Sequence, residues 1–143
     1  MSTENLSIIR TICALSKLVC ESHVEPTDSC LKITTMFFFP AGFFDRREFI
    51  LAQHPLEHTM ASFWQMAWEQ DVHLLVMLSS IDGQECTPFW PDGPGAHAFF
   101  NAGSMKMKVT LMDELDTAMW KAMRLSLEVR GGGSDGGAHI YIG

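Results

Sequence analysis

The sequence has little positive charge and no cluster of it. Ten Lys and Arg residues stand against 17 Asp and Glu residues, which gives a formal net charge of -7 at pH 7. No run of basic residues occurs anywhere in the chain. Because nucleic-acid binding depends on clustered Lys and Arg that neutralise phosphates, the charge balance argues against nucleic acid as a partner.

Metal-type cysteine spacing is also absent. The chain has four cysteines, and no Cys-x-x-Cys pair occurs among them. His54 and His58 are four residues apart, but Pro55 lies between them and no third ligand is evident. We therefore expect free thiols in a reducing, cytoplasmic compartment, with no bound metal and no other cofactor.

No apolar run is long enough to cross a membrane. The apolar stretch at 6–20 is interrupted by Arg10 and Lys17, which makes it a poor membrane span and a poor signal peptide. Apolar residues recur along it at helical spacing, which predicts a short amphipathic helix. These residues are Ile8, Ile12, Leu15 and Val19.

The 143 residues, 47% of them hydrophobic, suit one domain with a packed core. Residues 48–53 read as a short strand. Thr59 is a plausible N-cap for a helix over 60–69, whose aromatic residues we expect to pack in the core. The apolar run 72–80 predicts a strand buried on both faces, and a helix followed by such a strand suggests α/β layering.

The C-terminal part reads as antiparallel strands. Apolar and polar residues alternate over 104–112 and again over 122–130, which predicts two half-buried strands. The glycine-rich run 131–137 is expected to be a mobile connection, and residues 139–142 a further strand. Nearer the N-terminus, Pro40 and Gly42 interrupt the apolar segment 36–44, which predicts a buried turn between short extended pieces.

Fixed spacings of aromatic, proline and glutamine residues mark the stretch 48–91. It contains Phe-Ile-x-x-Gln-x-Pro-Leu, then Phe-Trp-x-Met-x-Trp-Glu, and finally Cys-x-x-Phe-Trp-Pro. These motifs resemble the N-terminal half of a protein tyrosine phosphatase domain, and the resemblance extends over about residues 36–130. The residues that carry it are Gln53, Pro55, Phe63, Trp64, Trp68, Glu69, Cys86, Trp90 and Pro91.

The resemblance implies an α/β (α+β) fold, a twisted mixed sheet with flanking helices. It leaves 1–35 as an unassigned segment and makes 36–143 a partial phosphatase-like domain, whose C-terminal half we expect to be missing. The family reaction is hydrolysis of phosphotyrosine through a cysteinyl-phosphate. In the family a glutamate at the place of Glu69 holds the phosphate-binding arginine, but here we expect a solvated or partly buried carboxylate at the helix end.

Trp90-Pro91-Asp92 is identical to the tripeptide of the family's general-acid loop, but it stands in another place. The Cys-x-x-aromatic-Trp-Pro segment precedes a hairpin in the family, far from the acid loop. Asp92 is therefore interpreted as an exposed turn residue beside Pro91 and Gly93, not as a general acid.

The family nucleophile is a cysteine followed six residues later by an arginine that holds the phosphate bidentately. The four positions six residues after a cysteine hold no arginine; they are Val19, Pro26, Met36 and Asp92. We therefore predict no catalytic residue in this chain and no activity of the chain alone.

His54 stands where active members of the family have glycine, which resembles the second, catalytically impaired domain of receptor-type phosphatases. On this reading the chain is the intracellular part of a membrane receptor. The alternative is a non-enzymatic binding or regulatory module that docks on another phosphatase domain or a signalling scaffold. A third interpretation is a truncated gene product without function.

Overall fold

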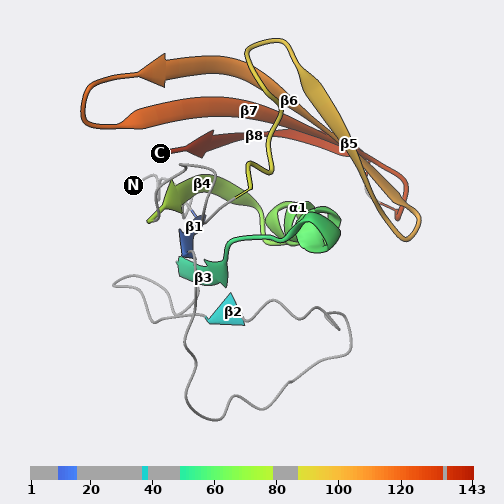
Figure 1. Cartoon of the computed structure of the whole chain (residues 1–143). Helices are drawn as coiled ribbons and strands as arrows, with labels where there is room; N and C mark the ends of the chain where they lie inside the picture. The colour runs from blue at the N-terminus through green and yellow to red at the C-terminus, as the bar shows by residue number, and fades with distance from the viewer. Residues whose placement is uncertain (1–9, 16–36, 39–48, 79–86, 134) are drawn as a thin grey trace, which may run out of the picture.

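The computed structural model describes residues 10–15, 37–38, 49–78, 87–133 and 135–143. In this part of the chain one strongly twisted sheet curves around a single α-helix, which lies on its concave side (Figure 1). The elements in chain order are β1 (Arg10–Leu15), β2 (Phe37–Phe38), β3 (Phe49–Gln53), the 3-10 turn η1 (Glu57–Thr59), α1 (Met60–Glu69), β4 (Val72–Met77), β5 (His97–Ala102), β6 (Met105–Asp116), β7 (Lys121–Arg130) and β8 (Gly136–Ile142).

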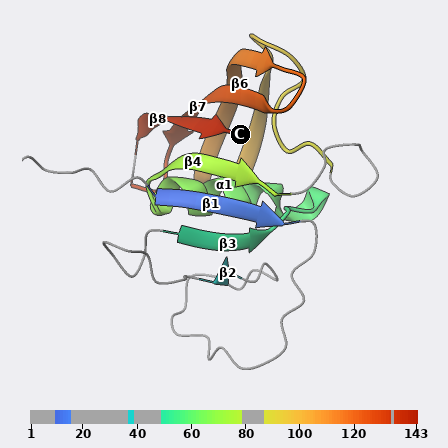
Figure 2. The ribbon, with the colours of Figure 1, turned by 90° about the vertical axis from the view of Figure 1, so that its left-hand side faces the viewer.

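The sheet is mixed. Its strand order is β2-β3-β1-β4-β8-β7-β6-β5. Strands β3, β1, β4 and β8 are parallel neighbours, as Figure 2 shows, whereas β8, β7, β6 and β5 pair antiparallel. The fold class expected from the sequence, a twisted mixed sheet with helical cover, is confirmed.

The prediction of a helix around Ile8, Ile12, Leu15 and Val19 is wrong for the described residues 10–15, because these residues form the strand β1. This strand lies between β3 and β4, with Ile12 in register with both Ile50 and Leu75. A central parallel strand reads as a continuous apolar run, which periodicity alone does not distinguish from a helix. The division at residue 35 stays a prediction, although β1 brings part of the preceding segment into the sheet.

Helix α1 has the predicted bounds, and its apolar face packs in the core. Thr59 occupies the N-cap position, but its hydroxyl caps no helical N–H. Instead the hydroxyl accepts a hydrogen bond from the Leu56 N–H at 2.9 Å and donates one to the Leu56 carbonyl at 3.1 Å. The side chain therefore stabilises the turn η1 that leads into the helix. The buried residues of α1 are Phe63, Trp64, Met66 and Ala67.

Trp64 is buried, as expected, and connects α1 to the segment that precedes β5. Its indole N–H donates to the Phe89 carbonyl at 3.0 Å. The centroid of its ring lies 5.7 Å from the ring centroid of Phe63, 5.6 Å from that of Phe89 and 6.4 Å from that of Phe100. Trp68, near the helix end, is partly buried and packs against the core cluster, in line with the expectation for the aromatic residues of this helix.

The alternation predicted for β6 and β7 is confirmed. The two strands pair antiparallel, and every second side chain is buried over 105–111 of β6 and over 123–129 of β7. Strand β6 runs further than expected, to Asp116. The buried side chains are Met105, Met107, Val109, Leu111, Met123, Leu125, Leu127 and Val129.

Strand β5 was not anticipated, because its sequence HAFFNA shows no regular alternation of apolar and polar residues. In β4, Val72 and Leu75 are buried and the other side chains are half-buried, so burial on both faces is less complete than predicted. Of the predicted turn over 36–44, the structure describes only β2, an extended piece paired with β3.

The glycine-rich run is not a connection throughout, because Gly136 and Gly137 belong to β8 and pair with β7. A Cβ at Gly136 would come within 2.8 Å of the Trp68 ring, which leaves space for glycine alone there. Local composition favours a loop, but pairing with β7 and the close approach of α1 make these residues a strand.

Replacing Trp64 tests the core. Trp64→Ala should lower the free energy of unfolding by about 3–5 kcal/mol, the usual cost of removing a large buried aromatic side chain. Trp64→Phe keeps most of the ring but leaves the Phe89 carbonyl unpaired, which should cost about 1–3 kcal/mol. Urea unfolding followed by circular dichroism measures both. The control is Trp120→Ala on the exposed hairpin, and an equal loss of stability in this control would contradict the assignment.

Candidate functional site

The motif residues lie around the C-terminal end of β3, the helix α1 and the segment before β5. Pro55, Phe63, Trp64 and Pro91 are buried, whereas Gln53, Trp68 and Trp90 are half-buried and Glu69 is exposed. Cys86 lies outside the described residues. Phe89, which the motifs include only as an aromatic position, is the hub of the group, with its ring 4.9 Å from Phe63 and 4.8 Å from Trp90.

His54 belongs to this aromatic group. The residue is only 4% exposed, and its ring meets that of Phe89 edge-on at 5.2 Å. Its Nε2 has no hydrogen-bond partner among the described residues. Burial lowers the pKa of His54 below its ordinary value, although a hydrogen bond with the Pro55 backbone opposes the shift. The ring is therefore held neutral and serves packing.

Asp92 is exposed, as the sequence predicted, and Pro91 beside it is buried. The residue lies in a surface hollow with Pro88, Trp90, Pro91 and Lys121. The hydrogen bond between Lys121 and Glu114 raises the pKa of Lys121, and the negative charge of Asp92 adds to the shift. Lys121, the cation near the Asp92 carboxylate, is thus already paired with Glu114. We interpret Asp92 as one of several surface charges.

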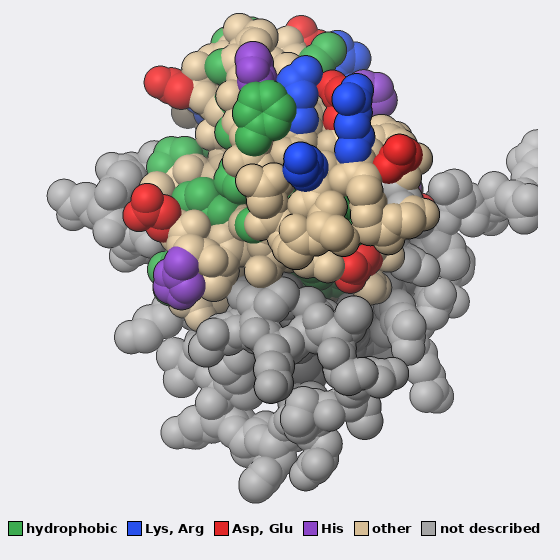
Figure 3. All heavy atoms as spheres, turned by 90° about the vertical axis from the view of Figure 1, so that its right-hand side faces the viewer, with side chains coloured by type: hydrophobic (Ala, Val, Ile, Leu, Met, Phe, Trp, Pro, Cys, Tyr) green, Lys and Arg blue, Asp and Glu red, His purple; other side chains and the backbone are tan. Residues whose placement is uncertain are grey.

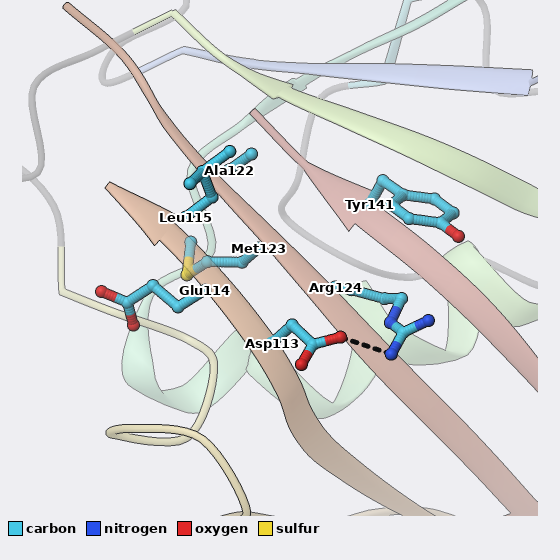
Figure 4. A pocket seen from close by; sticks show the side chains of 7 residues that line it. All are labelled: Asp113, Glu114, Leu115, Ala122, Met123, Arg124 and Tyr141. Carbon is cyan, nitrogen blue, oxygen red and sulfur yellow. Dashed lines mark hydrogen bonds and ion pairs between the residues drawn. The ribbon is translucent and has the colours of Figure 1, made fainter. Parts of the chain in front are cut away.

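A second hollow opens where the long β6–β7 hairpin meets β8 (Figure 4). Arg124 reaches from β7 to form an ion pair with Asp113 of β6, as the dashed line shows. Tyr141 lies beside them on β8, half-exposed. Asp113 and Arg124 neutralise each other, and no Cys, Ser, Thr, His or Lys side chain lies among the residues that line the hollow. The remaining lining residues are Glu114, Leu115, Ala122 and Met123.

Within the described ranges, no three His, Cys, Asp or Glu side chains come together as a metal site. The same part of the chain contains no helix long and apolar enough to span a membrane. The described residues thus form an aromatic cluster that packs in the core and open, partly charged surface hollows.

The neutral state of His54 makes stability depend on pH. Because the pKa of His54 is lower in the folded chain than in the unfolded chain, stability is complete above the unfolded pKa of about 6.5 and falls as the pH drops below it. His54→Gln should flatten this decline. Melting temperatures between about pH 7.5 and pH 5 measure it, with the exposed His58→Gln as control. An unchanged slope in His54→Gln would contradict the assignment.

Comparison with known proteins agrees with the motifs. The family model for "Protein-tyrosine phosphatase" matches residues 32–136. Tyrosine-protein phosphatase 99A of Drosophila melanogaster is 47% identical over 51 residues, 36% of this chain and 4% of that protein. Receptor-type tyrosine-protein phosphatase zeta of Rattus norvegicus is 40% identical over 79 residues, 51% of this chain and 3% of that protein.

Receptor-type tyrosine-protein phosphatase H of Homo sapiens is 31% identical over 110 residues, 73% of this chain and 9% of that protein. The chain therefore spans only 3% to 9% of the length of these three relatives. Since the family model covers most of the chain, including α1 and strands β2 to β7, the conclusion is direct: the chain belongs to the protein-tyrosine phosphatase family.

Proposed function

We propose that this chain is a non-catalytic part of a receptor-type tyrosine phosphatase, related to the second domain of such receptors, and that it acts by binding. The family reaction is phosphotyrosine hydrolysis. One observation carries the proposal: no cysteine of this chain has an arginine six residues after it. A thiolate without that guanidinium lacks the bidentate partner that holds the phosphoryl group for attack.

The role of Glu69 supports the same conclusion. Its carboxylate is exposed at the end of α1 and accepts a hydrogen bond from the Gln65 side-chain amide at 2.8 Å. No arginine is paired with it among the described residues. The carboxylate that orients the phosphate-binding arginine elsewhere in the family thus serves here as a surface group of the helix.

His54 supports the relation to a second domain. The imidazole fills space against Phe89 that a glycine would leave open, so the substitution belongs to the packing of this chain. The receptor-type relatives support a receptor origin of this chain. We therefore propose that the chain lies on the cytoplasmic side of a membrane receptor.

Hydrolysis is the direct test. The purified chain should release p-nitrophenol from p-nitrophenyl phosphate, and phosphate from a phosphotyrosine peptide, no faster than buffer does. Cys86→Ser should leave the result unchanged, because no arginine completes a phosphate loop around that thiol. Turnover that copurifies with the chain and disappears in Cys86→Ser would overturn the proposal.

A second candidate function is docking on another phosphatase domain. It rests on the tip of the β6–β7 hairpin, which extends beyond the rest of the sheet (Figure 1). Leu115 is 55% exposed, Met119 94% and Trp120 56%, so large apolar side chains gather at one end of the molecule. Such a patch is typical of a contact surface, and an apolar face of a neighbouring domain would cover it.

The hairpin should make the isolated chain associate. We expect oligomers in sedimentation velocity at micromolar concentration, and a shift toward monomer when Met119→Ser and Trp120→Ser are combined. Leu56→Ser, which removes a similarly exposed apolar side chain elsewhere, is the control. A monomeric wild-type chain, or equal dissociation in the control, would contradict the docking role of the hairpin.

A further inference from the structure

The solvent face of β5, β6 and β7 carries a basic and aromatic hollow that the family assignment does not explain. Lys and Arg side chains gather on this part of the surface, close to an aromatic ring (Figure 3). The described chain has more acidic than basic residues, so such a gathering runs against the overall charge. The residues that line the hollow are Phe99, Asn101, Lys106, Met107, Lys108, Glu128 and Arg130.

Two cations in this hollow are opposed without an acid to neutralise them. Lys106 of β6 and Arg130 of β7 are direct partners in the antiparallel register, and both side chains are exposed. No ion pair joins either of them to an acidic side chain within the described ranges. Like charges directly across a ladder are destabilising. An anion bound between them would remove that cost.

The next pair on the same face of the two strands has balanced charge. Lys108 lies opposite Glu128, and their side chains approach to 3.4 Å. The excess positive charge of the hollow is therefore confined to Lys106 and Arg130. A site with two unneutralised cations fits one or two carboxylates better than a polyanion, which requires a longer row of basic residues.

An aromatic side chain borders the same hollow. Phe99 is 67% exposed and stands opposite Lys108 in the β5–β6 register, while Asn101 stands opposite Lys106. Strand β5 is the last strand of the described sheet, so a chain segment can pass over this edge onto the solvent face of β6 and β7. Cations and an exposed ring on one face fit an extended peptide that crosses the strands.

We propose that this face binds an extended acidic peptide segment of a partner protein. The segment lies across β5, its carboxylates pair with Lys106 and with the guanidinium of Arg130, and a neighbouring apolar side chain packs on Phe99. The inference deepens the proposed binding role and rests on it. It is independent of the apolar hairpin tip, which lies on the opposite end of β6.

Fluorescence anisotropy tests the site with a short fluorescein-labelled peptide in which glutamate alternates with leucine and phenylalanine. Lys106→Gln and Arg130→Gln should each weaken binding by about threefold to tenfold, because each removes one exposed charge-assisted contact. Lys121→Gln, a cation paired with Glu114 outside the hollow, should leave affinity unchanged. Lys106→Arg should retain binding, and added salt should weaken it.

The peptide supplies further controls. Replacing its glutamates by glutamine should abolish binding, and Phe99→Ala should weaken binding only when the peptide keeps its phenylalanine. Equal affinity for the neutral peptide overturns the inference, as does unchanged affinity in both charge variants. Equal binding of single-stranded DNA or of phosphatidylserine vesicles overturns the assignment to a peptide. A change of oligomeric state in Lys106→Gln overturns it in favour of self-association.

Hydrolysis is measured on the same samples, so that the two proposals fail separately. Peptide binding without phosphotyrosine hydrolysis supports both. Hydrolysis by a chain that binds the peptide overturns only the non-catalytic role. If the folded chain neither hydrolyses phosphotyrosine nor binds the peptide, only the acidic-peptide site is overturned.

Discussion

The hydrogen bond from the Trp64 indole to the Phe89 carbonyl joins the two halves of the described structure. Trp64 comes from the helix beside the parallel strands, and Phe89 from the segment that leads into the antiparallel strands. Both groups are buried, so each would carry an unpaired polar atom without the other. Around this bond the rings of Phe63, Phe100 and His54 pack against Trp64 or Phe89.

The same cluster gives a structural reason for the family motif in a chain in which no cysteine has an arginine six residues after it. Pro55, Phe63, Trp64 and Pro91 are buried and fix the meeting of helix, β3 and the segment before β5. Their spacing is required by packing, which is independent of phosphate chemistry. His54 extends the cluster, and its burial lowers the pKa of the imidazole. We therefore interpret these motif residues as residues that stabilise the fold of the domain.

The two proposed binding functions depend on exposed surface patches. One is apolar, at the tip of the β6–β7 hairpin, and the other is basic and aromatic, on the face of β5 to β7. They lie at opposite ends of β6, so separate partners can occupy them. The basic and aromatic face lies where inner side chains of β6 and β7 fill the core and the alternate side chains face solvent, whereas the apolar tip lies beyond this alternation.

The sequence by itself determined the bounds of α1, the alternation of β6 and β7, the exposure of Asp92 and the family, because periodicity and motif spacing are local properties. Tertiary structure decided the rest. Residues 10–15 are a strand because β3 and β4 pair with them on both sides, and Gly136 is a strand residue because β7 pairs with it and the Trp68 ring leaves no space for a Cβ. Likewise Lys106 and Arg130, 24 positions apart in sequence, form one basic pair only because the hairpin register sets them opposite each other. Strand pairing brings distant residues together, and no local pattern encodes its register.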